Sequence, residues 1–188
     1  MSDAVSALGG RSYRGFVEIE EIGPLGMIAL RGDLAGAAIA KAVKAALGLG
    51  LPDQRGLLSG DGRAVGWMSP DELLLVMPYD EVASTLASLE NALKGNHFLA
   101  VDVSDARAVF RIRGPAAREV LAKLTSTDLY REVFHPGMLC RSRAAQVAAA
   151  FWMSGAEEFT LVSFRSVADY VFGLLQISAR PGGEVGLF

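Results

Sequence analysis

Hydrophobic and polar residues alternate along this chain in short runs, which are separated by segments with helical spacing. In the first half, residues 17–20 and 27–31 have the alternation of β-strands, and Gly23-Pro24-Leu25-Gly26 between them is a turn sequence. These runs predict a β-hairpin. Residues 64–68 and 73–77 predict a second hairpin, whose second strand is apolar enough to be buried on both faces.

A helix is expected after each of these hairpins. Asp33 can cap the first helix by accepting backbone N–H groups, and Gly48 can end it. The second helix is predicted over residues 80–94, with Gly95 closing it. Both segments carry apolar residues at three- and four-residue spacing, namely Ile39, Val43 and Ala46 in the first and Val82, Leu86, Leu89 and Leu93 in the second.

The second half repeats this order of elements. Residues 99–103 and 107–113 predict a hairpin, and residues 144–152 and 159–164 predict two further strands. Within 107–113 the apolar residues alternate with three arginines, so the arginines are expected on the wet or interfacial face. An irregular stretch around Pro136-Gly137 separates these two pairs of strands.

Two helices complete the second half. Pro115 suits the first turn of a helix because its missing N–H would have no partner there, and Ala117, Val120 and Leu121 supply an apolar stripe. Ser166 and Asp169 have the spacing of a capping box for the last helix.

Two short sequences recur at nearly the same offset, which indicates an internal repeat. Leu30-Arg31-Gly32 returns as Ile112-Arg113-Gly114, and Trp67-Met68-Ser69 returns as Trp152-Met153-Ser154. The offset is far longer than a solenoid repeat of about 20–50 residues, so each copy is expected to be a half-domain. The equivalent tryptophans are interpreted as packing residues.

The sequence therefore predicts an α+β fold of two pseudo-symmetric hairpin-helix-hairpin-helix halves. The predicted boundaries are 15–95 and 98–178, in one compact unit with flexible ends at 1–12 and 179–188.

Composition adds expectations about partners and compartment. Hydrophobic residues are 51% of the chain, with 21 glycines besides, which is above the roughly 45–50% apolar content of ordinary soluble domains. This favours a permanent partner surface, and the alternative is an efficiently packed Ala-rich core. No apolar run approaches a membrane span, and no secretory signal is recognised. With Cys140 alone no internal disulfide forms, so we expect a cytoplasmic protein.

The net charge of −3, without Lys/Arg-rich tracts, argues against a nucleic-acid partner. Basic side chains are nevertheless concentrated in residues 105–143, which hold eight against four acidic ones. This segment is either an anionic or acidic-partner surface or a set of solvated strand and helix faces. Our candidates for partner contacts are Arg111, Arg113, Arg141 and Arg143.

The sequence offers little chemistry of its own. The only histidines are His97 and His135, and neither has the pattern of a catalytic base beside a nucleophile. Two histidines and one cysteine fall short of a zinc ligand set, and no phosphate-binding loop is present. We therefore predict no catalytic, cofactor-binding or metal residue on this chain. Asp128, at a helix end, is the alternative cofactor-binding candidate, unless it bonds only to turn backbone.

The second half resembles the gamma subunit of heterotetrameric sarcosine oxidase, and the first half is similar to it around 67–75. This family is similar in turn to the folate-binding domain of the glycine-cleavage aminomethyltransferase, and that likeness implies the doubled α+β architecture. The resemblance rests on these strings: Val101-Asp102-Val103-Ser104-Asp105-Ala106-Arg107, Ile112-Arg113-Gly114-Pro115, Arg141-Ser142-Arg143-Ala144-Ala145-Gln146-Val147 and Phe164-Arg165-Ser166-Val167-Ala168-Asp169-Tyr170.

The resemblance also implies a division of labour. In the aminomethyltransferases an acidic residue in the strand after the loop contacts folate, and the corresponding stretch here, Val147-Ala148-Ala149-Ala150-Phe151, has only apolar side chains. The resemblance implies a structural gamma subunit docked on alpha in a complex with beta and delta. FAD, FMN, NAD and tetrahydrofolate are then expected on alpha and beta, and zinc on delta. The alternatives are a self-standing folate-binding or aminomethyl-transfer protein and an assembly scaffold for another flavin amine oxidase.

Overall fold

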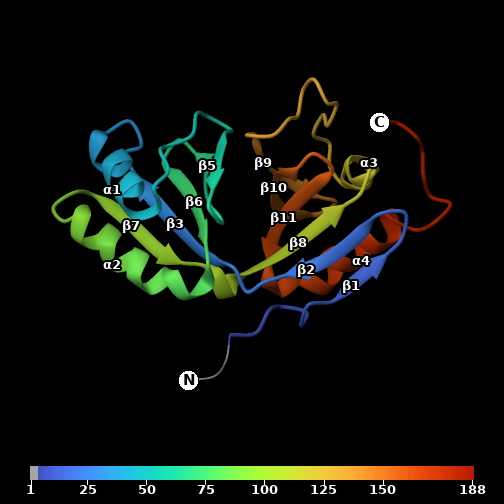
Figure 1. The fold of residues 1–188 in the computed structure, drawn as a ribbon, viewed down its shortest axis with the longest axis horizontal. Coiled ribbons are helices and arrows are strands. Elements are labelled where there is room, and N and C mark those ends of the chain that lie inside the picture. Colours follow the sequence, from blue (N-terminus) through green and yellow to red (C-terminus); the bar gives the residue numbers. More distant parts are fainter. Residues whose placement is uncertain (1–3) are drawn as a thin grey trace. The chain divides into compact units, whose positions relative to one another are not determined.

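The computed structural model describes residues 4–188 and contains two antiparallel sheets (Figure 1). The chain divides into two compact units. Unit 1 combines the residues through Pro24 with Asp105–Phe188, and unit 2 is Leu25–Ser104. The predicted α+β class agrees with this arrangement of helices on antiparallel sheets. The half-repeat boundaries 15–95 and 98–178 stay a prediction about internal similarity, because the compact units divide at other residues.

Unit 2 holds a five-stranded sheet in the order β4-β5-β6-β3-β7. Helices α1 (Ala37–Leu47) and α2 (Val82–Ala92) cover one face of it. Ile28 and Leu30 of β3 and Leu73 and Leu75 of β6 alternate toward these helices and form the core with Val43. The strands are β3 (Gly26–Gly32), β4 (Leu57–Gly60), β5 (Arg63–Ser69), β6 (Glu72–Met77) and β7 (Phe98–Asp102).

Unit 1 holds a six-stranded sheet in the order β1-β2-β8-β11-β10-β9. Helices α3 (Ala117–Ala122) and α4 (Ala168–Ser178) pack on one face, over a core rich in phenylalanine. Short 3-10 helices lie at Tyr79–Glu81, Ser104–Ala106 and Arg165–Val167. The strands are β1 (Ser12–Arg14), β2 (Glu18–Ile22), β8 (Arg107–Arg113), β9 (Leu139–Ala144), β10 (Val147–Gly155) and β11 (Glu158–Phe164).

Both hairpins predicted at the start of the two halves are wrong. β2 pairs with β8 instead of β3, and β7 pairs with β3 instead of β8. The first strand of each half therefore belongs to the sheet that is formed mainly by strands of the other half. As a result the order β2-β8-β11-β10-β9 in one sheet corresponds to β7-β3-β6-β5-β4 in the other. Strand patterning specifies which side chains face the core, not which strand lies alongside, so the sequence could not show this exchange.

The second hairpin of the first half is confirmed, because β5 and β6 pair antiparallel. The strand predicted at 144–152 corresponds to β10, which begins only at Val147 because the chain turns through Ala145, whose φ is +51°. The strand before this turn, β9, was not predicted. Strands β1 and β4 were not predicted either. Both are short and mostly exposed, so their sequences lack the apolar alternation that marks a half-buried strand.

The predicted helix ends are only partly correct. Gly48 ends α1 in the left-handed conformation, with φ +76°, as expected. Asp33 is not the cap, because α1 begins only at Ala37. The Asp33 Oδ1 instead accepts the N–H of Ala35 at 3.1 Å. Gly95 has φ +87° but lies beyond the end of α2 at Ala92, whose C-cap is Leu93.

The capping prediction for the last helix is wrong as well. Val167 is the N-cap of α4 and no side chain caps it; the carboxylate of Asp169 binds Arg11 at 2.8 Å. Pro115 likewise precedes the first turn of α3, whose N-cap is Ala116. A turn before α3 and a 3-10 helix before α4 follow the preceding strands. As a result α4 begins beyond the predicted cap Ser166, and α3 begins beyond Pro115, which was predicted for its first turn.

Buried carboxylates bind both terminal segments to unit 1. Glu21, which is 1% exposed, accepts Ser6 Oγ at 2.7 Å, Ala7 N–H at 2.9 Å and Gly10 N–H at 2.8 Å. Glu119 binds the last residues in the same way. Of the ends predicted to be flexible, residues 1–3 lie outside the described part, and the mobility of the rest stays a prediction. Within the described residues no helix has the length and apolar character that a membrane crossing needs.

Candidate functional site

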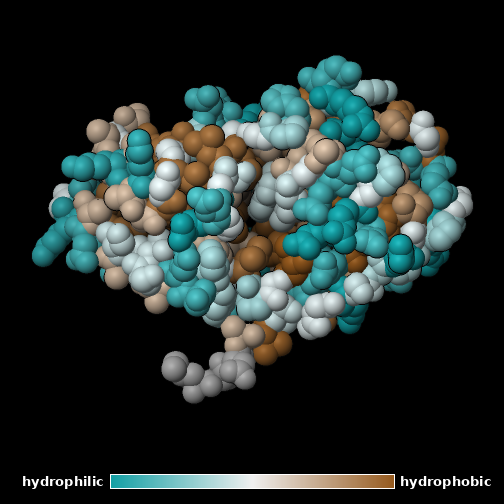
Figure 2. Space-filling view, in the orientation of Figure 1, coloured by the Kyte–Doolittle hydropathy of each residue, from teal (hydrophilic) through white to brown (hydrophobic). Residues whose placement is uncertain are grey.

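The face of the unit 1 sheet that is turned away from α3 and α4 is charged along β2, β8 and β11. Side chains alternate along a strand, so Arg111 and Arg113 lie on this face while Phe110 and Ile112 enter the core. This is the alternation that the sequence predicts. Figure 2 shows hydrophilic residues gathered over β2 and β8.

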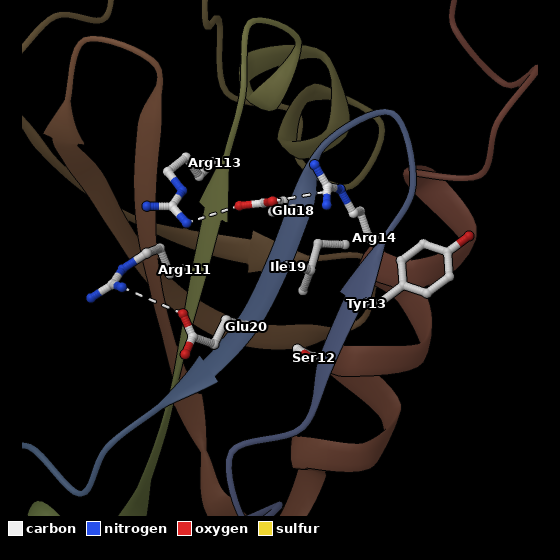
Figure 3. Close-up of a pocket in the computed structure, with 8 residues that line it drawn as sticks. All are labelled: Ser12, Tyr13, Arg14, Glu18, Ile19, Glu20, Arg111 and Arg113. Atoms are coloured by element: carbon white, nitrogen blue, oxygen red, sulfur yellow. Dashed lines mark hydrogen bonds and ion pairs between the residues drawn. The ribbon is translucent and has the colours of Figure 1, made fainter.

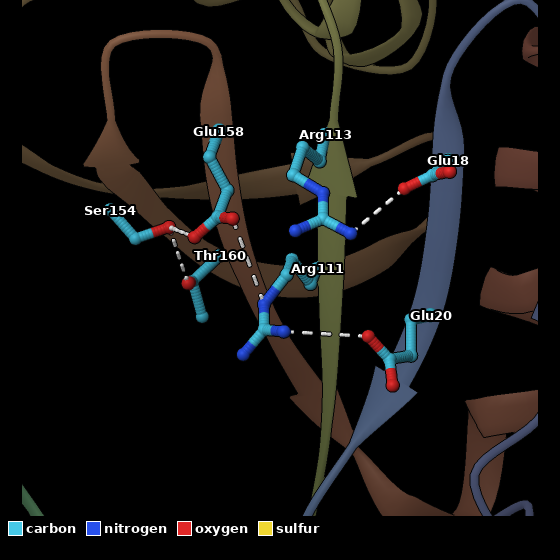
Figure 4. Close-up of polar contacts among 7 residues, drawn as sticks. All are labelled: Glu18, Glu20, Arg111, Arg113, Ser154, Glu158 and Thr160. Carbon is cyan, nitrogen blue, oxygen red and sulfur yellow. Dashed lines mark hydrogen bonds and ion pairs between the residues drawn. The ribbon is translucent and has the colours of Figure 1, made fainter.

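The strand register brings a carboxylate opposite each arginine (Figure 4). Glu18 lies across from Arg113 and Glu20 across from Arg111 in the β2–β8 ladder. The arginine nitrogens approach these carboxylates to 2.8 Å for Arg113–Glu18 and 3.4 Å for Arg111–Glu20. The hydrogen bond that Arg113 donates to Glu18 and the negative charge of Glu18 raise the pKa of Arg113 above its ordinary value. Both arginines are paired with carboxylates of the same chain.

Glu158 of β11 extends this network on the other side of β8. One of its oxygens lies 3.8 Å from Arg111 Nε, and the other accepts the Ser154 hydroxyl at 2.8 Å. Thr160 in turn donates to Ser154 Oγ at 3.1 Å. We call Glu18, Glu20, Arg111, Arg113 and Glu158 the charged face.

A hollow of about 260 Å³ opens beside this network, between β1, β2 and β8 (Figure 3). Glu18 lies there between Arg113 and Arg14, whose Nε is 3.6 Å from the carboxylate. Exposed ion pairs of this kind are screened by water and salt, so they do little for stability. The walls combine both signs of charge, which suits polar contact with a partner. The lining residues are Ser12, Tyr13, Arg14, Glu18, Ile19, Glu20, Arg111 and Arg113.

Arg141 and Arg143 lie apart from this network, on β9 at the opposite edge of the sheet. In the strand register Arg141 lies across from Ala150, Ala150 lies across from Val162, and Val162 lies across from Val109. Val109 is two residues from Arg111 on β8 and therefore faces the same side of the sheet. Since cross-strand partners share a face, all four predicted contact arginines project from one side of the sheet. Arg143 is exposed and donates to the carbonyl of Gln146 at 2.6 Å.

The other sequence candidates lie outside the charged face. Asp128 accepts the N–H of Tyr130 at 3.0 Å, which is the local turn bond considered as its alternative. His135 Nδ1 is 3.0 Å from the carbonyl of Pro136 in an exposed loop. His97 is exposed, and Cys140 is buried with its sulfur 3.3 Å from Thr127 Oγ1. Among residues 4–188, no group of three or more His, Cys, Asp or Glu has a metal-binding arrangement.

Sequence reasoning missed the buried charges of α3. Arg118, 5% exposed, donates to the carbonyls of Leu129 and Phe134 and lies 5.4 Å from the centre of the Phe159 ring. Burial lowers its pKa from the ordinary arginine value. Its neighbour Glu119 is equally buried. Both residues lie between apolar residues of a short helix, and this position is the only feature of the sequence that could have indicated their burial.

Sequence reasoning also missed the acidic half of the charged face. Glu18 and Glu20 share one side of β2, and their two-residue spacing matches that of Arg111 and Arg113 on β8. This spacing was a usable signal once the two strands were known to be neighbours. Because the sequence analysis paired β2 with β3 in a hairpin, it did not show that these glutamates lie opposite the arginines of β8.

Comparison with known proteins agrees with the architecture. Residues 31–180 match the sarcosine oxidase, gamma subunit family. The sarcosine oxidase subunit gamma of Corynebacterium sp. (strain P-1) is 32% identical over 169 residues, covering 87% of this chain and 80% of that protein.

Two solved structures are also similar. A chain of the heterotetrameric sarcosine oxidase from Corynebacterium sp. U-96 in complex with pyrrole 2-carboxylate has a TM-score of 0.80 and 28% identity, covering 87% of this chain and 83% of that one. The glycine cleavage system aminomethyltransferase T of Bartonella henselae shares the fold, with a TM-score of 0.63 at 18% identity over 86% of this chain and 45% of its own. The family match over most of the chain and the identity to this curated relative lead to one conclusion: the chain belongs to the sarcosine oxidase gamma subunit family.

Proposed function

We propose that this chain is the structural gamma subunit of a heterotetrameric sarcosine oxidase. The observation that carries this proposal is the family match over residues 31–180, which the TM-score of 0.80 to a chain of such a complex supports. The complex oxidatively demethylates sarcosine to glycine and forms hydrogen peroxide and 5,10-methylenetetrahydrofolate. A cytoplasmic location stays a prediction of the sequence.

In this proposal the chemistry belongs to the other subunits. Alpha and beta carry FAD, FMN, NAD and tetrahydrofolate, delta carries zinc, and gamma contributes no catalytic residue. Two features of this chain support the proposal. Ala148, Ala149 and Ala150, near the start of β10, provide only methyl groups, and the arginines of the charged face are already paired with its carboxylates.

We further propose that Arg111, Arg113, Arg141 and Arg143 contact the alpha subunit. Arg111 and Arg113 are held in place by Glu20 and Glu18, so they present ordered charge at the polar rim of an interface. Arg141 and Arg143 are both exposed on an edge strand, where a partner can reach them. Charges at a rim mainly affect the association rate, whereas a buried pair broken by substitution costs about 2–5 kcal/mol.

Co-expression with alpha, beta and delta subunits tests both parts of this proposal. The wild-type chain should co-purify in one complex on size-exclusion chromatography. The double charge reversal Arg141→Glu with Arg143→Glu should weaken assembly without changing the circular dichroism of the isolated chain. The matched control is Lys41→Glu with Lys44→Glu, which reverses two exposed charges on α1 and should leave assembly intact.

The two parts fail separately. If the wild-type chain does not co-purify, the subunit assignment is wrong. If the wild-type complex forms and the Arg141/Arg143 variant assembles equally well, only the docking face is wrong.

A further inference from the structure

The last six residues, 183–188, are held against α3 by hydrogen bonds to their backbone. The N–H of Val185 donates to one oxygen of Glu119 at 2.7 Å, and the N–H of Gly186 donates to the other at 2.9 Å. Both carboxylate oxygens are therefore used on consecutive residues of one segment. We call residues 183–188 the strap.

Lys123 binds the strap from the same side. Its ammonium lies 3.1 Å from Glu119, one helical turn away, and donates to the carbonyl of Gly183 at 2.6 Å. It also donates to the carbonyl of Ser178, at the end of α4, at 3.1 Å, and lies 4.9 Å from the centre of the Phe16 ring. Together Glu119 and Lys123 form a clasp that satisfies donors and acceptors of the strap.

Apolar burial contributes little to this attachment. Val185 is 70% exposed and Leu187 is 52% exposed, so neither side chain is removed from water to any large extent. Only Phe188 packs, with its ring 5.4 Å from that of Tyr130 in an edge-on contact and partly against the core of unit 1. A terminal segment with so little buried surface needs specific bonds to stay ordered.

We propose that the strap is a separately releasable element, closed by the Glu119–Lys123 clasp and opened by loss of the Glu119 charge while both sheets stay folded. Glu119 and Lys123 bind only backbone groups of the strap. The strap can therefore open without exposing a strand or breaking a sheet ladder, as expected of a local opening rather than global unfolding.

The electrostatics give the direction of the pH response. Burial by itself raises the pKa of Glu119, but the N–H groups of Val185 and Gly186 and the Lys123 ammonium outweigh it and lower the pKa below the ordinary 4.5. Lys123 is the charged side chain that faces Glu119, and the strap presents backbone N–H groups to it. A lowered pKa makes the bond fully present above the ordinary value and lost as pH falls through the lowered one. The strap is therefore closed at neutral pH and opens in acid.

Hydrogen exchange on the full isolated chain tests this proposal. At neutral pH, Glu119→Gln should speed exchange of the strap amides about tenfold or more, while sheet amides and the thermal melt stay close to wild type. The matched control Glu90→Gln removes an exposed carboxylate on α2 and should change neither. In wild type the strap amides should lose protection in acid before the sheets do. In Glu119→Gln that acid step should be absent.

A second pair of variants tests the same bond without altering the acid. Val185→Pro removes the N–H that Glu119 accepts, while Val185→Ala keeps it and shortens the same exposed side chain. Carboxypeptidase should trim the proline variant about tenfold faster than the alanine variant. Equal trimming, or strap exchange in Glu119→Gln at the wild-type rate, overturns the proposal, as does loss of the whole fold in both Glu119→Gln and Val185→Pro. These readouts need no other subunit, so they are independent of the proposed function.

Discussion

Arg118 and Glu119 are neighbouring charged residues of α3 that are both buried, and each binds backbone outside the helices and strands. Glu119 binds the strap, and Arg118 binds carbonyls at both ends of the segment from Leu129 to Phe134. A buried guanidinium is tolerated only when its donors are satisfied. Here backbone carbonyls take the place of the usual carboxylate partner. The Arg118 guanidinium therefore holds a loop in position and forms no ion pair with the described residues.

Replacing Arg118 should destabilise unit 1 strongly. Arg118→Met keeps much of the side-chain volume but leaves the carbonyls of Leu129 and Phe134 without their donor, which should lower the free energy of unfolding by about 2–4 kcal/mol. Urea denaturation followed by circular dichroism measures this change. Arg131→Met, at an exposed position of the same loop, serves as control and should change stability by less than about 0.5 kcal/mol. Equal losses in the two variants would show that the Arg118 bonds do not hold the loop.

At the level of elements, the exchange of β2 and β7 decides which segments fold together. β8 is central in its sheet because β2 pairs on one side and β11 on the other, and β3 is flanked in the same way by β7 and β6. A segment cut at the half-repeat boundary carries β2, which its own sheet does not use, and lacks β7, which that sheet needs. Each sheet is complete only when both sequence halves are present.

Two fragments of nearly equal length test this consequence. Residues 25–104 contain all five strands of the unit 2 sheet with α1 and α2, and this fragment should show a cooperative thermal melt and dispersed amide resonances. Residues 15–95 carry β2 and lack β7, leave β3 as an open edge, and should melt without cooperativity. A cooperative melt of 15–95 with the stability of 25–104 would contradict the importance of the exchanged strand.

For the molecule as a whole, the chain shares its fold with an aminomethyltransferase, and its own polar groups indicate what this fold can do here. The fold match to this aminomethyltransferase has a TM-score of 0.63; in the present chain residues 148–150 of β10 are alanines, and Asp128 is bonded to its own turn. Under the proposed function, the surface of this chain serves assembly. The isolated chain should therefore bind none of the small molecules that the complex uses.

Purification of the isolated chain tests this expectation. It should show no flavin band at about 450 nm, and titration calorimetry should show tetrahydrofolate binding no tighter than roughly millimolar. Asp128→Asn should change nothing, since the residue is taken to act only in its turn. Micromolar folate binding that Asp128→Asn abolishes would instead favour the self-standing folate-binding protein.

Features that depend on a few neighbouring residues could be predicted from the sequence. The arginine alternation of 107–113 follows from the two-residue period of a strand, the β5–β6 hairpin from two closely spaced strand-like runs, and the end of α1 at Gly48 from glycine's freedom at positive φ. Helix starts were predicted less well. Asp33 and Ser166 had suitable side chains, but the backbone around them formed other turns.

The sequence by itself determined the fold class, the order of most elements, the side of β8 on which the arginines lie and, by resemblance, the family. Periodicity and turn chemistry act over a few residues, and they survive in any arrangement of the elements. Only the tertiary structure decided that β2 and β7 change sheets, that Glu18 and Glu20 neutralise Arg113 and Arg111, and that Glu119 closes the strap. These contacts join residues distant along the chain, and their partners are chosen by the packing of whole sheets, which no local pattern records.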